Sequence, residues 1–258
     1  MSAVARRLIK VGLTNLHKTS YLQTRNMSGD ISGMRKPYRT QKELFDVQHL
    51  VAKEPFEQFR HWFDEASAVD GIEANAMSLA TAARNGAPSV RMVLLKGFST
   101  EGFTFFTNYQ SRKAKELEEN PRCSLMFYWE PLKRCVRVEG SVEKVSEEES
   151  LTYFQSRPRD SQIGAIVSQQ GQVITSREAL DKRNGELQKE YSSESKDVPK
   201  PDYWGGYLVR PTVVEFWQGQ SNRLHDRIVF RHLQPGETIN TETTHQGDNG
   251  WVYERLSP

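Results

Sequence analysis

The stretch Ala76-Met-Ser-Leu-Ala-Thr-Ala-Ala83, followed by Asn85-Gly86 and then Ser89-Val-Arg-Met-Val-Leu-Leu95, decides the fold class. Asn-Gly between two β-prone runs is a strong signal of a tight hairpin. Few helices separate these runs from the later ones, which favours an α+β fold, an antiparallel β-barrel with peripheral helices, over a parallel βαβ sheet. Further strands are expected at residues 102–107, 124–129, 134–145, 206–210, 213–217, 228–231 and 251–256.

Helices are predicted where apolar residues recur at helical spacing or where a capping sequence begins a segment. Residues 55–68 start with proline, which suits a first helical position, and place Phe56, Phe59, Phe63 and Ala66 on one face. Ser111 is expected to cap a short helix that ends near residue 120. The capping boxes Ser146-Glu-Glu-Glu149 and Thr175-Ser-Arg-Glu178 predict helices to about residues 157 and 191, and Pro158 separates the first from a helical piece at 161–168.

The composition is that of an ordinary globular protein. The chain has 258 residues, with 36% hydrophobic and 26% charged residues, which suits one large domain or two small ones. A formal net charge of +2 is too small to indicate non-specific binding of nucleic acid. No apolar run approaches the roughly 20 residues that a membrane helix needs, so neither nucleic acid nor membrane is expected as a partner. The sequence lacks both a Gly-x-Gly-x-x-Gly motif and a Walker loop.

The chain has two cysteines, Cys123 and Cys135. If Trp129 pairs with Arg134 in a hairpin, Cys123 faces Gly140, and Cys135 lies five positions along the same strand, roughly 17 Å away at about 3.4 Å per residue. A disulfide cannot span that distance, and the spacing does not suggest zinc. We therefore expect reduced thiols in an intracellular, cytoplasmic protein.

The first 29 residues contain no Asp or Glu and carry five basic residues, at positions 6, 7, 10, 18 and 25. This composition resembles a mitochondrial presequence. The alternative is a disordered basic leader without an address, which we favour because the apolar spacing is irregular. Residues 1–33 are thus predicted to be a disordered leader, and residues 34–258 the functional domain.

Basic residues occur in two places where a bound anion would make them favourable. Arg91 and Lys96 bracket a strongly apolar run, so their charges need either an exit to solvent or an anion. Arg112 and Lys113 stand at a predicted helix start, where they oppose the helix dipole, and a bound phosphate would reverse that effect. The alternatives are an edge strand with solvated ends and an exposed first helical turn.

Two further groups point to anionic ligands. Tyr153 and Arg157 are four residues apart on a predicted helix, and Ser161 continues their face if the chain passes the intervening proline without a sharp bend; together they would make a phosphate cradle. An ordinary surface pair is the alternative. Arg223, His225 and Arg227 occupy alternate positions, which on a strand would form a row of cationic donors that repel one another unless a phosphate or an electron-rich aromatic ligand lies among them.

These motifs, taken in order from about residue 34 to residue 258, closely resemble the pyridoxine 5′-phosphate oxidase family. The resemblance implies an FMN-binding split β-barrel that works as a homodimer, with each active site built from both subunits and with the C-terminal region taking part in dimerisation. The motifs that carry it are Arg91-Met-Val-Leu-Leu-Lys96-Gly-Phe, Phe105-Phe-Thr-Asn108, Ser111-Arg-Lys113, Phe127-Tyr-Trp-Glu-Pro131, Ser156-Arg-Pro158, Ser161-Gln-Ile-Gly164, and Glu215-Phe-Trp-Gln-Gly-Gln220 through Asn222-Arg-Leu-His-Asp-Arg227.

The resemblance also assigns roles residue by residue. It implies FMN contacts for Arg91, Met92, Val93, Leu94, Phe106, Thr107, Arg112, Lys113, Gln170, Trp217 and Arg227. It implies substrate contacts for Arg35, Tyr38, Lys96, Tyr153, Arg157 and Ser161, and catalytic positions at the pyridine ring for Arg223 and His225. The chain departs from the family pattern where Cys135 replaces a glutamine that contacts FMN and where Gly171 replaces a common serine.

The implied reaction transfers a hydride from the C4′ carbon of the substrate to the flavin. Pyridoxine 5′-phosphate then gives pyridoxal 5′-phosphate directly, whereas pyridoxamine 5′-phosphate gives an imine that water hydrolyses to pyridoxal 5′-phosphate. Oxygen is then reduced to hydrogen peroxide, and the amine substrate also releases ammonia. The flavin supplies the redox chemistry, and the protein supplies alignment and electrostatics. Two alternatives remain: another flavin-dependent oxidoreductase on the same barrel, and a non-catalytic protein that binds pyridoxal phosphate.

Overall fold

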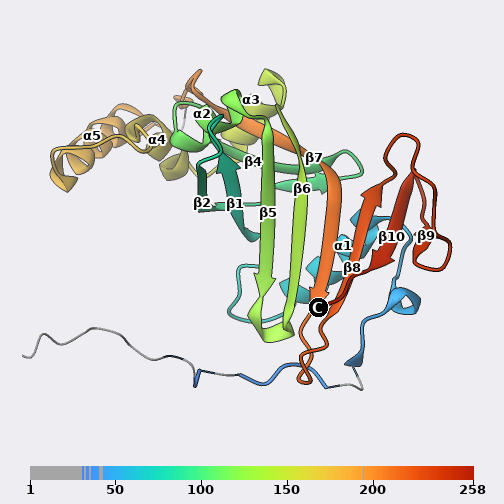
Figure 1. The fold of residues 1–258 in the computed structure, drawn as a ribbon. Coiled ribbons are helices and arrows are strands. Elements are labelled where there is room, and N and C mark those ends of the chain that lie inside the picture. The colour runs from blue at the N-terminus through green and yellow to red at the C-terminus, as the bar shows by residue number, and fades with distance from the viewer. Residues whose placement is uncertain (1–30, 32, 35, 41–42, 194) are drawn as a thin grey trace, which may run out of the picture. The chain divides into compact units, whose positions relative to one another are not determined.

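A computed structural model describes residues 31, 33–34, 36–40, 43–193 and 195–258 (Figure 1). Arg35 and nearly all of the predicted leader lie outside these residues. The chain divides into the units Met1–Lys36 and Pro37–Pro258, and every element below belongs to the second unit.

The described part of the second unit is built on one antiparallel sheet of ten strands. The strand order is β2-β1-β5-β6-β7-β8-β10-β9, while β4 pairs with both β3 and β7. Among the described residues these ladders do not close into a ring, but the predicted α+β class with an antiparallel sheet and peripheral helices is confirmed. The strands are β1 Ala76–Ala82, β2 Pro88–Leu94, β3 Gly97–Ser99, β4 Gly102–Asn108, β5 Arg122–Trp129, β6 Arg134–Lys144, β7 Trp204–Gln218, β8 Asp226–His232, β9 Thr244–Gln246 and β10 Trp251–Arg255.

Strand β7 is longer than predicted and is shared by two parts of the sheet. Its first half pairs with β4, its second half pairs with β8, and β6 runs beside both halves. The sequence predicted two strands, 206–210 and 213–217, with a break near Pro211, and that break is wrong. Proline cannot donate to a ladder, but it is tolerated at a bulge. The register between β6 and β7 shifts between Glu139 and Gly140, and Gly140 faces Pro211 there.

The predicted hairpins are confirmed. Ala82 pairs with Pro88 across the Asn85-Gly86 turn, and Gly86 has the positive φ of 83° that such a turn requires of one residue. Trp129 pairs with Arg134, so Cys123 faces Gly140 as expected, and both cysteines are free thiols. Strands β3 and β9 were not predicted, because three-residue strands are too short to show alternation.

The helices follow the predicted order with corrected ends. The N-cap of α5 is Ser176, whose side chain accepts from the backbone of Ala179, so the predicted cap at Thr175 is one residue too early. Ser111 occupies the N-cap of α2 but makes no capping hydrogen bond, because its hydroxyl accepts from Lys113 instead. The described helices are η2 Val47–His49, α1 Pro55–Ser67, α2 Arg112–Glu119, η3 Glu130–Leu132, α3 Glu147–Ser156, α4 Arg159–Val167 and α5 Arg177–Glu190.

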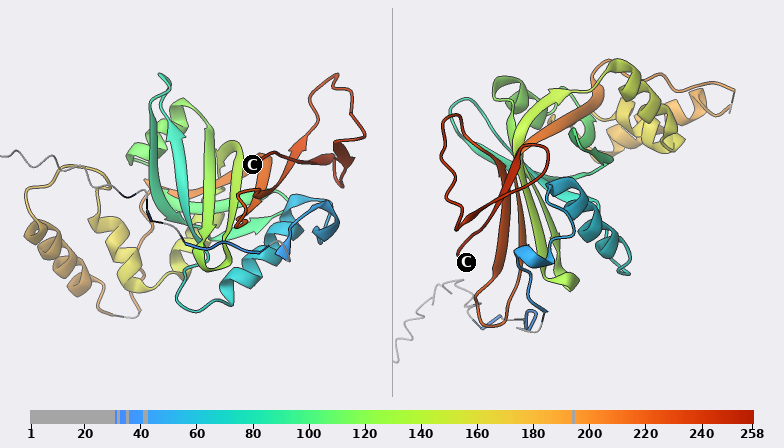
Figure 2. Two further views of the ribbon diagram at one scale, coloured as in Figure 1. Left: turned by 60° about the horizontal axis from the view of Figure 1, so that its bottom comes forward. Right: turned by 90° about the vertical axis from the view of Figure 1, so that its right-hand side faces the viewer.

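Helix α1 supplies the centre of the main core. Glu54 caps it by accepting from the backbone N–H groups of Phe56 and Glu57. Phe59 is fully buried, and its ring centroid lies 5.0 Å from that of Phe103 and 5.1 Å from that of Phe127, both on the sheet. Aromatic pairs at such spacings add to the stabilisation from burial. Figure 2 shows α1 packed along the strands, well apart from α4 and α5.

Helices α3, α4 and α5 form a second, smaller core with the start of β7. Phe154 of α3 packs edge-on against Trp204 of β7 with ring centroids 5.1 Å apart. Ile163 and Leu187, from α4 and α5, also belong to this cluster. Figure 1 shows these helices gathered at one end of the long strands, so the sheet and the helices together can enclose a site there. None of the helices in the described part of the chain has the length and apolar character to cross a bilayer.

The bulge between β6 and β7 gives a test of the fold. A Cβ added at Gly140 would lie 2.1 Å from the backbone carbonyl oxygen of Arg210, so we expect Gly140→Ala to destabilise the protein by about 1–3 kcal/mol through overpacking. Gly185, in α5, has open space around its Cα, and Gly185→Ala should stabilise by about 0.5–1 kcal/mol because alanine is the better helix former. Urea unfolding measures the free energy of unfolding of both variants. If Gly140→Ala were as stable as Gly185→Ala, Gly140 would not approach the backbone of Arg210 this closely.

Candidate active site

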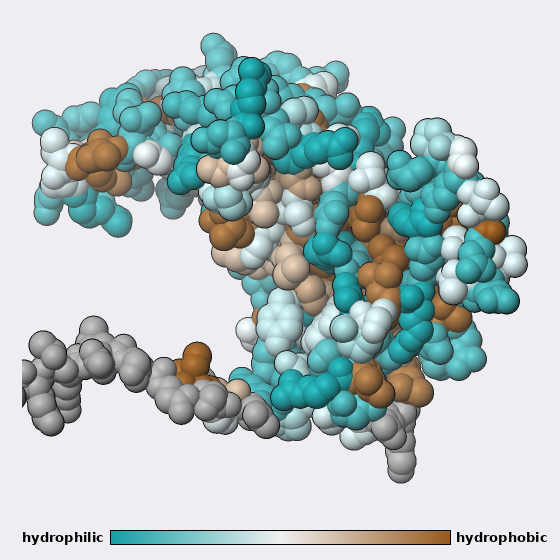
Figure 3. All heavy atoms as spheres, in the orientation of Figure 1, coloured by the Kyte–Doolittle hydropathy of each residue, from teal (hydrophilic) through white to brown (hydrophobic). Residues whose placement is uncertain are grey.

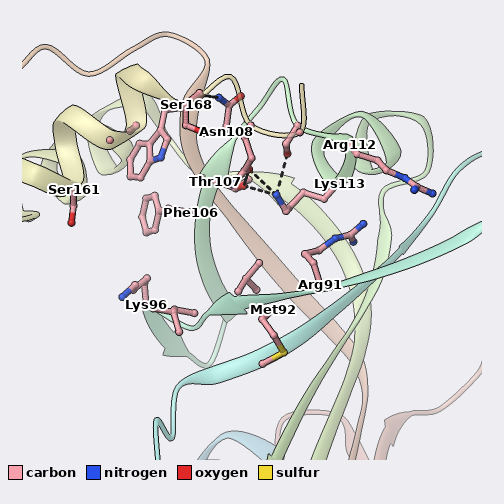
Figure 4. A pocket seen from close by; sticks show the side chains of 18 of the residues that line it. Arg91, Met92, Lys96, Phe106, Thr107, Asn108, Arg112, Lys113, Ser161 and Ser168 are labelled. Atoms are coloured by element: carbon pink, nitrogen blue, oxygen red, sulfur yellow. Dashed lines mark hydrogen bonds between the residues drawn. The ribbon is translucent and has the colours of Figure 1, made fainter. Parts of the chain in front are cut away.

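A cavity of about 930 Å³ lies between edge strand β2, strand β4, the start of α2 and helices α3 and α4. The close-up in Figure 4 shows Arg91, Arg112 and Lys113 toward one end and Lys96 and Ser161 toward the other. The fold thus brings together three groups that the sequence singled out separately: Arg91 with Lys96, Arg112 with Lys113, and Tyr153 with Arg157 and Ser161. The predicted residues that line this cavity are Arg91, Met92, Val93, Leu94, Lys96, Phe106, Thr107, Arg112, Lys113, Tyr153, Arg157, Ser161 and Gln170.

Lys113 is a buried cation at the α2 end of the cavity. Its ammonium donates to Gln170 Oε1 at 2.8 Å, Thr107 Oγ1 at 3.2 Å and Ser111 Oγ at 3.3 Å. Burial and the charge of Arg91 lower the pKa of Lys113 to about 8, although Glu116 opposes the shift. No carboxylate receives this ammonium directly in the described structure, so the site favours an incoming anion.

Arg91 and Arg112 share one buried carboxylate, that of Glu116. Arg91 Nη2 lies 3.2 Å from Glu116 Oε2, and Arg112 Nε lies 2.8 Å from Oε1. Burial raises the pKa of Glu116, but hydrogen bonds from Ser89, Thr81 and both arginines outweigh it and bring the pKa down to about 2. The predicted edge strand is confirmed for β2, yet Arg91 also donates to Leu79 O and is not simply solvated.

The sequence analysis missed Glu116. A signal was present, because Glu116 stands four residues after Arg112 in α2, a spacing that pairs opposite charges on one helix face. That pair alone would read as an ordinary surface salt bridge. Only the packing of α2 against β1 and β2 shows that the carboxylate is buried.

Arg157 marks the other end of the cavity. It is the C-cap of α3 and has an extended backbone, so the predicted shared helix face of Tyr153 and Arg157 is wrong, although both residues line the cavity. The guanidinium lies over the ring of Trp204, 4.7 Å from its centroid, and its Nη1 is buried without a hydrogen-bond partner. Burial lowers the pKa of Arg157. A buried donor without a partner is costly, which makes this nitrogen a binding position for an acceptor.

Trp217 and Arg227, which were expected to contact the flavin, lie outside the first cavity. They line a second cavity of about 490 Å³ together with Cys135, Arg137 and Glu215, and this cavity shares no lining residue with the first. Neighbouring strands contribute these residues, since Cys135 pairs with Trp217 across β6 and β7, and Trp217 pairs with Arg227 across β7 and β8. The expected flavin residues are therefore divided between two places in one chain.

The predicted row of Arg223, His225 and Arg227 on one strand face is wrong. Only Arg227 belongs to a strand, β8. Arg223 has a φ of 69°, in the left-handed region, because it lies in the tight turn between β7 and β8. Alternate residues share a face only on an extended chain, so a turn breaks the row.

That turn nevertheless collects Arg223 and His225 beside Tyr38. The ring of Tyr38 lies 5.5 Å from that of His225 and 6.0 Å from that of Trp217, and the guanidinium of Arg223 lies 5.7 Å from the centre of the Tyr38 ring. The backbone N–H of Gln220 donates to Nδ1 of His225 at 3.0 Å. An imidazole that accepts at Nδ1 carries its proton on Nε2 when it is neutral.

The electrostatics keep His225 neutral. Burial and the charge of Arg223 lower the pKa of His225, although Asp226 opposes the shift. Nε2 is consequently a hydrogen-bond donor at neutral pH. The Arg223–His225 pair combines one fixed cation with one neutral donor.

Cys135 lies at the wall of the second cavity, opposite Tyr128 on β5 and Trp217 on β7. Burial, with the charge of Glu215, raises the pKa of its thiol to about 11. The thiol is thus protonated at neutral pH and is a weak hydrogen-bonding group. Gly171, the other departure from the family pattern, lines the first cavity with a φ of 88°.

Glu215 stands in a motif that carries the family resemblance, but the sequence analysis gave it no role. It alternates with Trp217 on β7, so both side chains project to the same face of the sheet. Arg227 Nε donates to Glu215 Oε1 at 2.7 Å, and Arg137 donates to Oε2. Its partners are distant in sequence, and no local pattern predicts them.

Comparison with known proteins places the chain in one family. Residues 65–189 match the family model described as pyridoxamine 5′-phosphate oxidase, and residues 204–258 match the pyridoxine 5′-phosphate oxidase C-terminal dimerisation region. The chain is 56% identical over 240 residues to pyridoxine-5′-phosphate oxidase from Bos taurus, covering 92% of this chain and 91% of that protein. It is 54% identical to pyridoxine/pyridoxamine 5′-phosphate oxidase from Bombyx mori, covering 91% of each.

A solved structure supports the same fold. The crystal structure of PhzG from Burkholderia lata, in complex with tetrahydrophenazine-1-carboxylic acid, resembles this chain with a TM-score of 0.72. The two sequences are 26% identical, and the match covers 83% of this chain and 98% of that one. An FMN-binding protein from Nostoc punctiforme shares the fold with a TM-score of 0.59 at 16% identity, covering 80% of this chain and 98% of that one. With two family models that together span most of the sequence and relatives above half identity, the chain belongs to the pyridoxine 5′-phosphate oxidase family of oxidoreductases.

Proposed function

We propose that this chain oxidises pyridoxine 5′-phosphate and pyridoxamine 5′-phosphate to pyridoxal 5′-phosphate, with FMN as cofactor and oxygen as electron acceptor. The single observation that carries the proposal is the first cavity, whose lining includes a buried cation, Lys113, and a buried nitrogen of Arg157 without a hydrogen-bond partner. Hydrogen peroxide is the expected second product, and ammonia is released from the amine.

The residues of the first cavity fit FMN. Lys113 lacks a direct carboxylate partner among the described residues, and Arg91 and Arg112 add two guanidinium groups beside it. Arginine and lysine are the usual ligands of phosphate, so we assign the flavin phosphate to this end. The side chains of Met92 and Leu94, in β2, supply apolar surface near these charges. When bound, FMN supplies the hydride acceptor for the C4′ carbon of the substrate.

The opposite end fits the substrate phosphate. Arg157 has a free buried donor, and the hydroxyls of Tyr153 and Ser161 and the ammonium of Lys96 lie in the same cavity. The rings of Phe106 and Tyr153 stack with centroids 4.0 Å apart, which fixes the tyrosine. These groups would hold the phosphate equally in the ground state and in the transition state, and so would mainly determine substrate affinity.

A homodimer explains why the expected site residues are divided. The second cavity, with Trp217 and Arg227, and the neighbouring turn, with Arg223 and His225, would complete the first cavity of a partner subunit. Apolar side chains that are exposed in the single chain support such an interface, because large exposed apolar patches mark contact surfaces. They are Val90 and Met92 on β2 and Met126 and Tyr128 on β5. Figure 3 shows hydrophobic surface over the region of β1 and β2.

In this arrangement, Arg223 and His225 act at the pyridine ring. The guanidinium is permanently charged and would favour negative charge that develops on the ring. The neutral imidazole would donate a hydrogen bond from Nε2 to the substrate. Tyr38 packs against both side chains and limits their movement.

The proposal is tested by purifying the protein and examining its absorption. We expect a yellow flavin spectrum that is bleached by pyridoxine 5′-phosphate or pyridoxamine 5′-phosphate without oxygen and that returns on admission of air. Stoichiometric peroxide should accompany the return. A flavoprotein that neither substrate bleaches would contradict the oxidase function, and a colourless protein that binds pyridoxal phosphate would indicate a non-catalytic binder.

Arg157→Ala should raise KM for pyridoxine 5′-phosphate by roughly 10- to 100-fold and change kcat little. The reason is that a charged hydrogen bond contributes about 1.5–3 kcal/mol, and a contact present in both ground and transition states is uniform binding. Steady-state kinetics measures the change. Arg177→Ala, which removes an exposed arginine of α5, is the control and should leave both constants unchanged. An unaltered KM in Arg157→Ala would return Arg157 to a purely structural role.

The pKa of Lys113 predicts how flavin affinity depends on pH. Below about pH 8 the ammonium is charged and binds phosphate, so the affinity of apo-protein for FMN should fall as pH rises from 8 to 9.5. Titration of FMN fluorescence at each pH measures this. Lys113→Arg keeps its charge throughout, and its affinity should vary much less. Equal pH dependence in the two proteins would contradict the assignment.

The stability of the apo-protein should rise as pH increases from about 8 to 10.5, whereas its affinity for FMN falls. Lys113 loses its proton near pH 8 when folded, whereas its ordinary pKa is 10.5. Between these values the unfolded chain binds more protons, so this group makes the folded state more stable as pH rises.

A further inference from the structure

The second cavity contains a charge cluster that crosses three neighbouring strands. Arg137 lies on β6, Glu215 on β7 and Arg227 on β8. Glu215 accepts from Arg227 Nε at 2.7 Å through Oε1 and from Arg137 Nη2 through Oε2, so a single carboxylate separates the two guanidinium groups. Without it, the two cations would face each other across the strand between them.

Arg227 is held at two of its three guanidinium nitrogens. Nε is bound by Glu215, and Nη1 donates to the carbonyl oxygen of Ser257 at 2.9 Å. None of the described residues accepts a hydrogen bond from Nη2, and Arg227 lines the second cavity. A guanidinium is planar, so two fixed nitrogens also fix the direction of the third.

Glu215 is almost fully buried, with 6% of its side chain exposed. Burial raises the pKa of Glu215, but hydrogen bonds and charges from Arg227 and Arg137 outweigh it and leave the pKa below its ordinary value. The carboxylate is therefore charged at neutral pH. A buried charge without a role in binding would often be replaceable by an apolar residue at no cost in stability, and this makes its presence informative.

We propose that Glu215 is a positioning residue, which orients Arg227 in the second cavity for contact with FMN and thereby sets flavin affinity. The inference rests on the proposed function, in which the second cavity completes the FMN-binding first cavity of a partner subunit, and on the family resemblance, which implies a flavin contact for Arg227. Arg137 is the other salt-bridge partner of Glu215 and completes the neutralisation of its carboxylate. Arg137 also pairs with Glu139, which does not contact Arg227, so Glu139 offers a matched control.

The experiment measures the dissociation constant of FMN for full-length apo-protein by quenching of flavin fluorescence. We expect Glu215→Gln to raise the dissociation constant of FMN about tenfold or more, which corresponds to the free energy of one charge-assisted hydrogen bond. Arg227→Ala should weaken binding by a similar factor. In the double variant the loss should be no greater than in Arg227→Ala alone, because both changes remove the same contact. Glu139→Gln should stay within about twofold of the unaltered protein.

The melting temperature of each apo-protein separates a loss of fold stability from a loss of the FMN contact. If Glu215→Gln and Arg227→Ala multiply in their effects on FMN affinity, Glu215 acts through the fold and the proposal is wrong. If Glu215→Gln binds FMN normally while Arg227→Ala does not, the proposal fails and the proposed function stands. If Arg227→Ala also binds FMN normally, the flavin assignment of Arg227 fails together with the proposal, while substrate bleaching still reports on the oxidase function.

Glu215→Asp covers the case in which Glu215→Gln does not fold. Aspartate keeps the charge but is one methylene shorter, so it should not reach both arginines. We expect weaker FMN binding with a melting temperature closer to that of the unaltered protein. Unchanged affinity in Glu215→Asp would overturn the requirement for a precisely placed carboxylate.

Discussion

The pairing of β7 with three other strands is the constraint on which the rest of the structure depends. Its first half binds β4 and so closes one side of the first cavity, and its second half binds β8 and so places Arg227. Both halves must fit β6, and the bulge opposite Gly140 absorbs the change in register between them. Bulges increase local twist and redirect side chains, so this single irregularity allows one strand to serve two cavities.

Each cavity solves the same electrostatic problem in the same way. Two arginines that converge repel one another, and each pair is held by one buried carboxylate. Glu116 holds Arg91 and Arg112 in the first cavity, and Glu215 holds Arg137 and Arg227 in the second. The carboxylates fix the arginine side chains before a ligand arrives, which reduces the cost of ordering them on binding.

Local signals in the sequence were sufficient for much of the fold. The Asn85-Gly86 turn, the aromatic spacing of α1 and the cap at Ser146 depend on neighbours in the chain, and each was predicted at nearly its observed position. The failures depend on distant partners. The predicted strands 206–210 and 213–217 are one continuous β7, because Pro211 lies at a bulge whose partner, Gly140, is far away in sequence.

The candidate site shows the same division. The resemblance to a family identified residues that the structure gathers into the first cavity, whereas alternation alone placed Arg223 on a strand that is in fact a turn. No local pattern marks Glu116 and Glu215 as the buried partners of the arginines in the two cavities. Their burial, and not their identity, makes them important, and burial is a tertiary property.

The separation of the two cavities has a consequence for inheritance. In the proposed homodimer, each active site takes its first cavity from one subunit and its second from the other. When two alleles are expressed together, a subunit damaged at Lys113 can pair with a subunit damaged at Arg227, and the pair then contains one doubly damaged site and one intact site. Two alleles damaged in the same cavity leave no intact site in any pairing. Alleles of this protein should therefore fall into two complementing classes, defined by the cavity that each one alters.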